Sequence, residues 1–92
     1  MPRPRIPRRL RFNPEVYYFK PRGVRLQGLE EVVLASDEME ALKLVDSDEL
    51  KQEEAAKKME VSQPTLARIL ASGRKKLTGA VVGGQAIRIE GV

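Results

Sequence analysis

The chain has 92 residues, 41% of them hydrophobic, and it contains no cysteine and no histidine. This length supports one domain with a modest core. The two missing residue types exclude disulfides, thiolate metal sites and histidine-based catalysis, and we expect no metal and no other cofactor. No apolar run is long enough to cross a membrane and no signal peptide is apparent, so we expect a cytoplasmic protein without a membrane partner.

Positive charge is concentrated in the N-terminal quarter of the sequence. Residues 1–25 carry eight basic side chains against Glu15 alone, a net charge of +7. The remaining residues carry nine basic and twelve acidic side chains, a net charge of −3. A basic segment beside a mildly acidic domain favours a polyanionic partner, of which nucleic acid is the simplest. The alternative is a solvated tail that only improves solubility.

Residues 1–11 form the first predicted segment, a basic arm. Three prolines among five arginines disfavour a helix and favour an extended backbone. Such an arm can lie in the minor groove of DNA, where arginine senses a narrow, negative, A·T-rich groove. We therefore predict DNA contacts for Arg3, Arg5, Arg8 and Arg9.

A short strand is predicted at Val16–Phe19, which holds three of the four aromatic side chains between two prolines. We expect these rings to pack in the core or in an interface rather than to stack on bases. Residues 29–34 fit a strand and a helix equally well.

The next predicted element is a helix over residues 37–45, capped by Ser36 or Asp37. Asp37 and Glu40 have the spacing of a loose capping box. The apolar side chains recur at helical spacing and would face the core: Met39, Leu42 and Val45. Residues 46–49 form an acidic loop, for which capping and solvation are favoured over metal binding because an EF-hand needs a longer ligand pattern with a central glycine.

Residues 52–71 predict two helices joined by a tight turn. The first helix spans residues 52–59, the turn lies at Glu60–Val61, and the second helix begins at Ser62. The Ser62 hydroxyl can accept a hydrogen bond from a free amide of the first helical turn. Pro64 falls within that turn, where a missing amide costs little. The apolar residues of both helices have helical spacing: Ala55, Ala56 and Met59 in the first, and Leu66, Ile69 and Leu70 in the second.

This stretch resembles the helix-turn-helix domains of bacteria and archaea, above all the DNA-binding region four of sigma factors. In those domains a pattern such as Glu-x-Ala-x-x-x-Gly-x-Ser-x-x-Thr-x-x-x-x-Leu is common. Five residues match it: Glu54, Ala56, Ser62, Thr65 and Leu70. Glu60 stands where these domains usually have glycine, at a turn position that often needs a positive φ.

Taken whole, the chain resembles the uncharacterised protein family 0251, also called domain of unknown function 134. The stretches that carry this resemblance are residues 1–5, 14–16, 18–21, 37–42 and 52–70. The resemblance implies a DNA-binding protein and carries no specific target with it.

The second helix is expected to continue beyond residue 71. Three apolar side chains keep its helical stripe: Leu70, Leu77 and Val81. Gly73 is predicted to be a weak point of the helix. The basic cluster at residues 74–76 can contact phosphates or complement the end of the helix dipole. Gly83–Gly84 should end the helix.

Gln85–Glu90 alternates apolar and polar residues, which predicts a strand. A strand needs a partner because unpaired backbone groups are costly when buried, and Val16–Phe19 is the obvious one. The two segments can pair within one chain or across two chains. We slightly favour a homodimer through these terminal strands, because a two-stranded ribbon is marginal and palindromic DNA requires two recognition helices in a fixed relation.

The predicted fold is therefore mainly α. It is a trihelical helix-turn-helix domain, winged-helix or sigma region-four-like, with a basic N-terminal arm and short terminal β-strands. Its predicted parts are an arm with a short strand at residues 1–35, a helix-turn-helix domain at 36–82 and a C-terminal strand at 83–92.

The predicted function is sequence-specific binding of double-stranded DNA by a transcriptional regulator. The alternative is a protein-interaction or RNA-binding module that uses the same basic trihelical domain. We do not expect an enzyme: the chain has carboxylates, lysines, Ser and Thr, but no set of nucleophile, base and orienting group can be assembled from them with any specificity.

The helix that begins at Ser62 is expected to enter the major groove. Gln63 can pair with adenine, and Arg68 can reach guanine or a phosphate. Lys51 and Gln52 can hold phosphates. Outside the arm, the predicted DNA-binding residues are Lys51, Gln52, Ser62, Gln63, Pro64, Thr65, Ala67, Arg68, Arg74 and Lys75.

Overall fold

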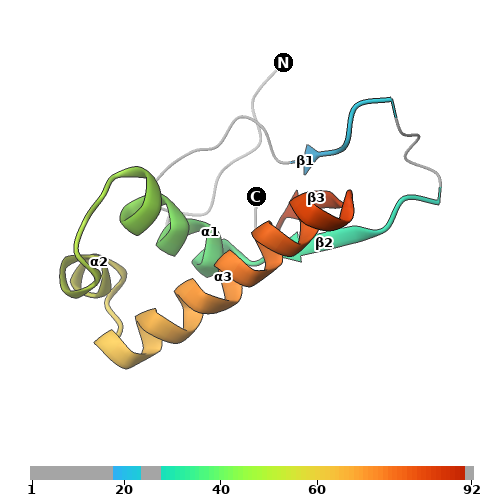
Figure 1. Ribbon diagram of the computed structural model, residues 1–92. Helices are drawn as coiled ribbons and strands as arrows, with labels where there is room; N and C mark the ends of the chain where they lie inside the picture. Colours follow the sequence, from blue (N-terminus) through green and yellow to red (C-terminus); the bar gives the residue numbers. More distant parts are fainter. Residues whose placement is uncertain (1–17, 24–27, 91–92) are drawn as a thin grey trace, which may run out of the picture.

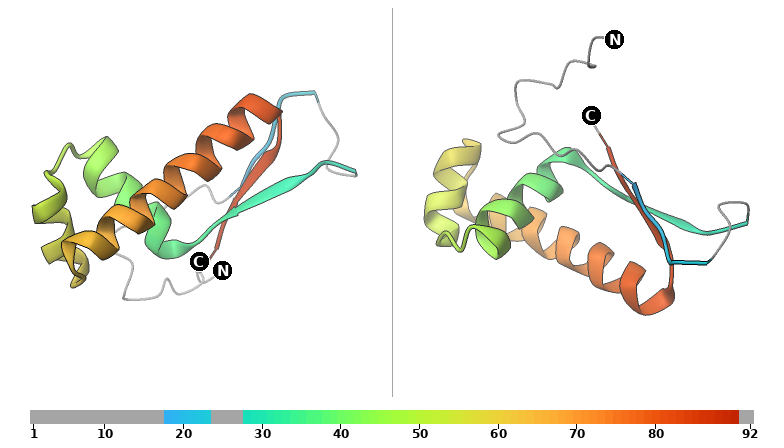
Figure 2. Two further views of the ribbon diagram at one scale, coloured as in Figure 1. Left: turned by 60° about the horizontal axis from the view of Figure 1, so that its bottom comes forward. Right: turned by 90° about the horizontal axis from the view of Figure 1, so that it is seen from above.

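The computed structural model describes residues 18–23 and 28–90. In chain order its elements are β1 (Tyr18–Phe19), β2 (Glu31–Leu34), α1 (Ser36–Leu42), a π-helical stretch η1 (Lys43–Ser47), α2 (Gln52–Met59), α3 (Gln63–Gly83) and β3 (Ala86–Ile89) (Figure 1). The prediction of a mainly helical domain with three helices and short strands is confirmed. Figure 2 shows α3 as the longest element, with α2 near its first turns and the sheet near its last.

The sheet has the strand order β1-β3-β2. β3 pairs antiparallel with β1, where Phe19 lies opposite Ile87, and parallel with β2, where Val32 lies opposite Ile87. The ambiguous residues 29–34 thus contain a strand. Parallel neighbouring strands need a long crossover connection. Here that connection between β2 and β3 contains all the helices: α1, η1, α2 and α3.

The predicted pairing of the terminal strands occurs here within one chain. Tyr18 lies opposite Arg88, and both carry side chains on the face of the sheet that bears Glu31. Arg88 Nε donates a hydrogen bond of 2.9 Å to Glu31 Oε1. Val16 and Tyr17, the first half of the predicted strand, lie outside the described residues. The homodimer stays a prediction.

The start of α1 differs from the prediction. Ala35, not Ser36 or Asp37, precedes the first helical residue, and its amide donates a 2.9 Å hydrogen bond to Glu38 Oε1. The predicted Asp37–Glu40 capping box is wrong, since Asp37 is exposed and accepts from the Glu38 amide, whereas Glu40 is buried. The box is displaced because the Glu38 carboxylate, three residues after Ala35, reaches the helix start.

The helix after α1 also changes its geometry. Residues 43–47 form the π-helical η1, which is closed by a 2.8 Å hydrogen bond from the Asp48 amide to the Lys43 carbonyl. Met39 and Val45 are half-buried and pack on the core, and Leu42 is buried, so the predicted inward face is confirmed. The helical backbone extends two residues beyond the predicted end at Val45.

The core lies between α1, α2, α3 and the inner face of the sheet. Leu34, Leu66 and Leu70 are its largest fully buried side chains. The predicted stripe on α3 is wrong at two positions, because Leu77 is 37% exposed and Val81 is 70% exposed. The small residues Gly73 and Ala80 are buried instead, since α3 approaches α1 and the sheet closely at those points.

Gly73 is a packing position rather than a weak point. A Cβ atom added there would lie 3.3 Å from Leu42 Cγ and 3.3 Å from Glu38 Cβ, both on α1. Glycine therefore permits the close approach of α1 and α3. Gly79, one and a half turns later, has no atom within 4 Å of the same added Cβ.

Beside Gly73, a polar cluster joins α1 to α3. The Glu38 side chain is only 7% exposed, and it accepts hydrogen bonds from Ser72 Oγ and, at 2.9 Å, from Lys76 Nζ. Lys76 also donates a 3.2 Å hydrogen bond to the Val33 carbonyl. Burial alone would raise the pKa of the Glu38 carboxyl, but the hydrogen bonds from Ser72, the Ala35 amide and Lys76 outweigh it and lower the pKa below its usual range.

A larger side chain at Gly73 should separate the two helices. We expect Gly73→Leu to lower the free energy of unfolding by about 1–3 kcal/mol through overpacking. Gly79→Leu is the matched control, because it makes the same change on the same helix in open space. It should raise stability by roughly 0.5–1 kcal/mol through helix propensity. Urea denaturation measures both, and equal effects at the two positions would contradict the close packing of α1 on α3.

Removing the charge of Glu38 should lower stability in a pH-dependent way. Because the folded-state pKa is depressed, the contribution of Glu38 is fully present above its unfolded pKa and is lost as the pH falls through the folded pKa. We expect Glu38→Gln to cost about 1–3 kcal/mol near neutral pH. The difference from the unmodified chain should shrink in acid.

The measurement is urea denaturation of both proteins across a pH series from neutral to acid. Glu53→Gln, at an exposed position of α2, is the matched control and should change stability little. A difference between Glu38→Gln and the unmodified chain that stays constant with pH would show that Glu38 acts through packing alone.

Candidate nucleic-acid interface

The turn between α2 and α3 has the geometry that the sequence predicted. α2 ends at Met59, and Glu60 adopts a left-handed conformation with φ 58° and ψ 43°. The Val61 amide donates to the Ala56 carbonyl at 3.0 Å, and the Glu60 amide donates to the Lys57 carbonyl at 3.2 Å. These two bonds form a Schellman motif, which usually places glycine at the left-handed position. The sequence left the sign of φ at Glu60 open, and the structure gives it the positive value that this turn position often needs.

The start of α3 is also as predicted. Ser62 is the N-cap, and its Oγ accepts a 3.2 Å hydrogen bond from the Thr65 amide. The Ser62 hydroxyl also donates to Thr65 Oγ1 at 2.8 Å. Pro64 lies in the first turn, where backbone N–H groups have no intrahelical acceptor, so the N–H that proline lacks is not missed. The first turn of α3 is therefore fixed by its own side chains.

One face of α3 is buried and the other is open to solvent. Leu66 and Leu70 are buried against the rest of the domain, as are Ala55 and Ala56 of α2. The exposed residues on the other side of α3 include four that were predicted to contact DNA, Gln63, Pro64, Ala67 and Arg68, together with Ala71. Ala55 and Ala56 are small, which allows α2 to pack closely against the buried side of α3. The exposed side of α3 is then left uncovered by α2.

Two cations lie along the outward face of α3. Arg68 and Lys75 are exposed and stand seven residues apart, which places them on one side of the helix two turns from each other. Within the described part of the chain, no side chain forms a hydrogen bond or ion pair with either of them. Both cationic groups are thus available to an anionic partner.

Arg74 has a different position. Its Nη2 lies 2.7 Å from Asp46 Oδ1 and its Nε lies 3.1 Å from Asp46 Oδ2, a bidentate pair that ties α3 to η1. Hydrogen bonds from Arg74 lower the pKa of the Asp46 carboxyl below its usual range. Arg74 was predicted, together with Lys75, to contact DNA, and no local pattern signals its pair with Asp46, 28 residues away in the sequence.

Two residues at the start of α2, Lys51 and Gln52, were predicted to contact phosphates. Lys51 is exposed and Gln52 is half-buried. The Lys51 amide donates a 3.4 Å hydrogen bond to Glu54 Oε1, so an acidic side chain occupies the first turn of α2. Lys57 and Lys58, both exposed in the last turn of α2, were not singled out from the sequence. They lie directly before the turn, five and four residues from Ser62 in the sequence.

The arginines of the predicted arm, Arg3, Arg5, Arg8 and Arg9, lie outside the described residues. Among the residues that the structure does describe, no helix is both long and apolar enough to cross a membrane. The candidate interface consists of the first turns of α3 with their caps, together with Lys75.

Comparison with known sequences identifies the family. The chain matches the family described as "Protein of unknown function DUF134" over residues 1–92, and it belongs to that family. A "UPF0251 protein" of Moorella thermoacetica is 56% identical over 91 residues, which cover 99% of this chain and 61% of the relative. The "UPF0251 protein TTE1845" of Caldanaerobacter subterraneus subsp. tengcongensis is 52% identical, over 99% of this chain and 77% of the relative. No solved structure matches.

Proposed function

We propose that this member of the DUF134 family binds double-stranded DNA and acts as a transcriptional regulator. In this proposal α2 and α3 form a helix-turn-helix of the sigma region-four-like or winged-helix kind, and the first turns of α3 enter the major groove. The chain spans 61% of the Moorella relative, so the proposal concerns the part of the protein that this sequence contains.

The observation that carries the proposal is the division of α3 into a buried and an outward face. Leu66 and Leu70 anchor the helix from behind, whereas Gln63, Arg68 and Lys75 extend from the open side. The major groove of B-DNA admits an α-helix, and the side chains near the start of a recognition helix reach the base edges. A rigidly capped first turn supports such a role, because it holds the contacting side chains in one arrangement.

In this proposal, some of the exposed side chains contact bases and others contact phosphates. Gln63 can form a bidentate pair with adenine and Arg68 with guanine, which would supply base discrimination. Lys75, two turns further along, and Lys51 can contact phosphates, which fixes the position of the protein without reading sequence. Arg74 is a weaker candidate for a phosphate contact, because Asp46 holds its Nε and Nη2 in a bidentate pair.

Glu53 and Glu54 occupy the first turn of α2, so the surface around α2 is not strongly basic and would attract DNA only weakly. We therefore assign most of the non-specific affinity for DNA to the basic arm. Its net positive charge would attract the phosphate backbone, and a helix that carries few cations would provide the selectivity.

An RNA-binding or protein-interaction module remains the alternative. Phosphate contacts alone do not distinguish RNA from DNA, and small trihelical domains also bind proteins. The experiment that separates these functions is selection of genomic DNA fragments by the purified chain, with sequencing of the bound pool. Enrichment of a common motif supports the proposal, and a pool without any motif argues against sequence-specific DNA binding.

Arg68→Ala and Gln63→Ala should weaken binding to the selected site. Both side chains are exposed, so the fold should be retained, and removal of a bidentate pair with a base should cost about 1–3 kcal/mol. Binding to random DNA should change less. Fluorescence anisotropy with labelled duplexes measures both affinities.

Arg22→Ala is the charge-matched control for Arg68→Ala. Arg22 is exposed in the turn after β1, which Figure 1 shows at the end of the molecule remote from α2. Its removal should affect selected and random DNA little and equally. If Arg68→Ala behaves like Arg22→Ala, the outward face of α3 is not the reading surface.

Neutralising the arm should lower affinity for all sequences alike. Replacement of Arg3, Arg5, Arg8 and Arg9 by Gln should flatten the dependence of log affinity on log salt by about 0.9 for each phosphate that the arm no longer neutralises. Preference for the selected site over random DNA should be preserved. An unchanged salt slope, measured by anisotropy over a salt series, would show that the arm does not bind phosphates.

A further inference from the structure

The ion pair between Asp46 of η1 and Arg74 of α3 lies at one border of the outward face of α3. Consecutive residues of an α-helix are rotated by about 100°, so Arg74 and Lys75 project from the helix in different directions. The exposed Ala71 lies between them on the helix surface, because it precedes one by three residues and the other by four. Arg74 and Lys75 therefore flank the outward face on its two sides.

A helix in the major groove lies between two phosphate backbones. The groove is about 12 Å wide, and a helix with its side chains is about 10–12 Å across. Cations on opposite flanks of the outward face would thus face opposite backbones. Among the described residues, Lys75 has no hydrogen bond or ion pair within the chain, whereas the charge of Arg74 is already compensated by Asp46.

The pair is open to exchange with another anion. The Arg74 side chain is 48% exposed and the Asp46 side chain is 43% exposed, so solvent reaches both groups. A carboxylate and a phosphate bind guanidinium through the same bidentate geometry. A phosphate that takes the same edge of Arg74 must displace Asp46, and the exchange gains little because one bidentate contact replaces another.

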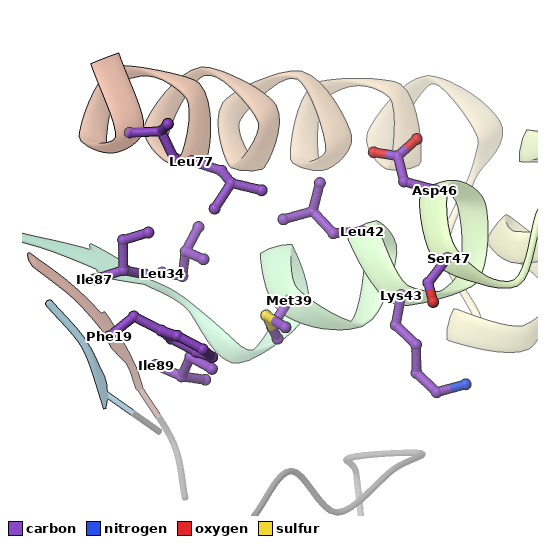
Figure 3. Close-up of a pocket in the computed structure, with 11 residues that line it drawn as sticks. Phe19, Leu34, Met39, Leu42, Lys43, Asp46, Ser47, Leu77, Ile87 and Ile89 are labelled. Atoms are coloured by element: carbon purple, nitrogen blue, oxygen red, sulfur yellow. The ribbon is translucent and has the colours of Figure 1, made fainter. Parts of the chain in front are cut away.

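The neighbouring charges of η1 do not take part in this pair. Figure 3 shows Asp46 on the side of η1 that faces α3, with Lys43 pointing away from α3. Lys43 is paired with Asp48, the next acidic residue along the chain. Two similar ion pairs thus lie within a few residues of each other, and one of them holds a cation of α3.

We propose that Asp46 is a positioning residue that competes with DNA phosphates for Arg74 and thereby weakens sequence-independent binding. This inference rests on the proposed function of the outward face of α3. A phosphate contact adds affinity for every sequence alike, so a cation withheld by Asp46 lowers the affinity for random DNA without the loss of a base contact. Weaker binding to random DNA leaves more of the protein free to find its site among many competing sequences.

Asp46→Asn tests the competition, because it removes the carboxylate charge with little change of size and frees Arg74. We expect the affinity for a labelled random-sequence duplex, measured by fluorescence anisotropy, to rise about fivefold to tenfold near 0.1 M salt. The dependence of log affinity on log salt should become steeper by about 0.9, the value for one added phosphate contact. A carboxylate that only held η1 against α3 would leave this slope unchanged.

Asp48→Asn is the matched control. It removes the same charge two residues away and breaks a similar pair, but the partner is Lys43, which points away from α3. The net charge of the chain changes equally in the two variants, so a general electrostatic effect would raise the affinity of both alike. We expect the steeper salt dependence in Asp46→Asn alone.

A second comparison separates the contact from the charge. On an Arg74→Gln background, Asp46→Asn should raise the affinity for the random duplex no more than Asp48→Asn does in the unmodified chain. Asp46→Ser removes the carboxylate in another way and serves as the test variant where Asp46→Asn folds poorly, as judged by urea denaturation.

The outcomes distinguish this inference from the proposed function. If the unmodified chain and both Asn variants bind the duplex with equal salt slopes, or if the gain persists without Arg74, the competition is overturned and the proposed function stands. A chain that binds no duplex at any salt concentration would overturn the proposed function and this inference together.

Discussion

The close contact between α1 and α3 at Gly73 is the constraint on which the rest of the structure depends. Without a Cβ at this position, Leu42 can lie directly against the backbone of α3, and the Glu38 carboxylate can reach Ser72 and Lys76. The same carboxylate accepts from the Ala35 amide and so fixes the start of α1, where β2 ends. One glycine and one buried acid thereby set the relation between the sheet and the helix that carries the candidate interface.

α3 contacts different parts of the molecule along its length. Its first turns are capped by Ser62 and expose their outward side chains, and its middle is packed on α1. Its last turns lie beside the sheet, where Leu77 and Val81 are exposed. All three regions lie on one uninterrupted helix of 21 residues.

The local features of residues 52–71 were predictable from the sequence, whereas side-chain contacts between distant residues, such as Arg74 with Asp46 and Lys76 with Glu38, were not. The bounds of α2 and the Ser62 cap depend on side chains a few residues apart, and both predictions were confirmed. Glu60 adopts a left-handed conformation although glutamate is disfavoured there, because Val61, Ala56 and the start of α3 fix the turn from both sides. By contrast, the exposure of Leu77 and Val81 depends on how far the sheet extends along α3. Helical periodicity does not predict the extent of the sheet, so it did not predict that these two side chains are exposed.

The cations of α3 show why charge counting from sequence is insufficient. Of the four, Arg74 is bound by Asp46 and Lys76 by Glu38 and the Val33 carbonyl, so these two hold α3 to the rest of the domain. Arg68 and Lys75 are spaced seven residues apart and lie together on the outward face. The sequence reads Arg74-Lys75-Lys76 as one basic cluster, but helical geometry turns its members in different directions. Among the described residues, Lys75 is the one member of that cluster that has no hydrogen bond or ion pair within the chain. An interface along α3 would thus be narrow, with few charges, and it would need both the shape of the helix and an additional source of affinity to bind DNA tightly.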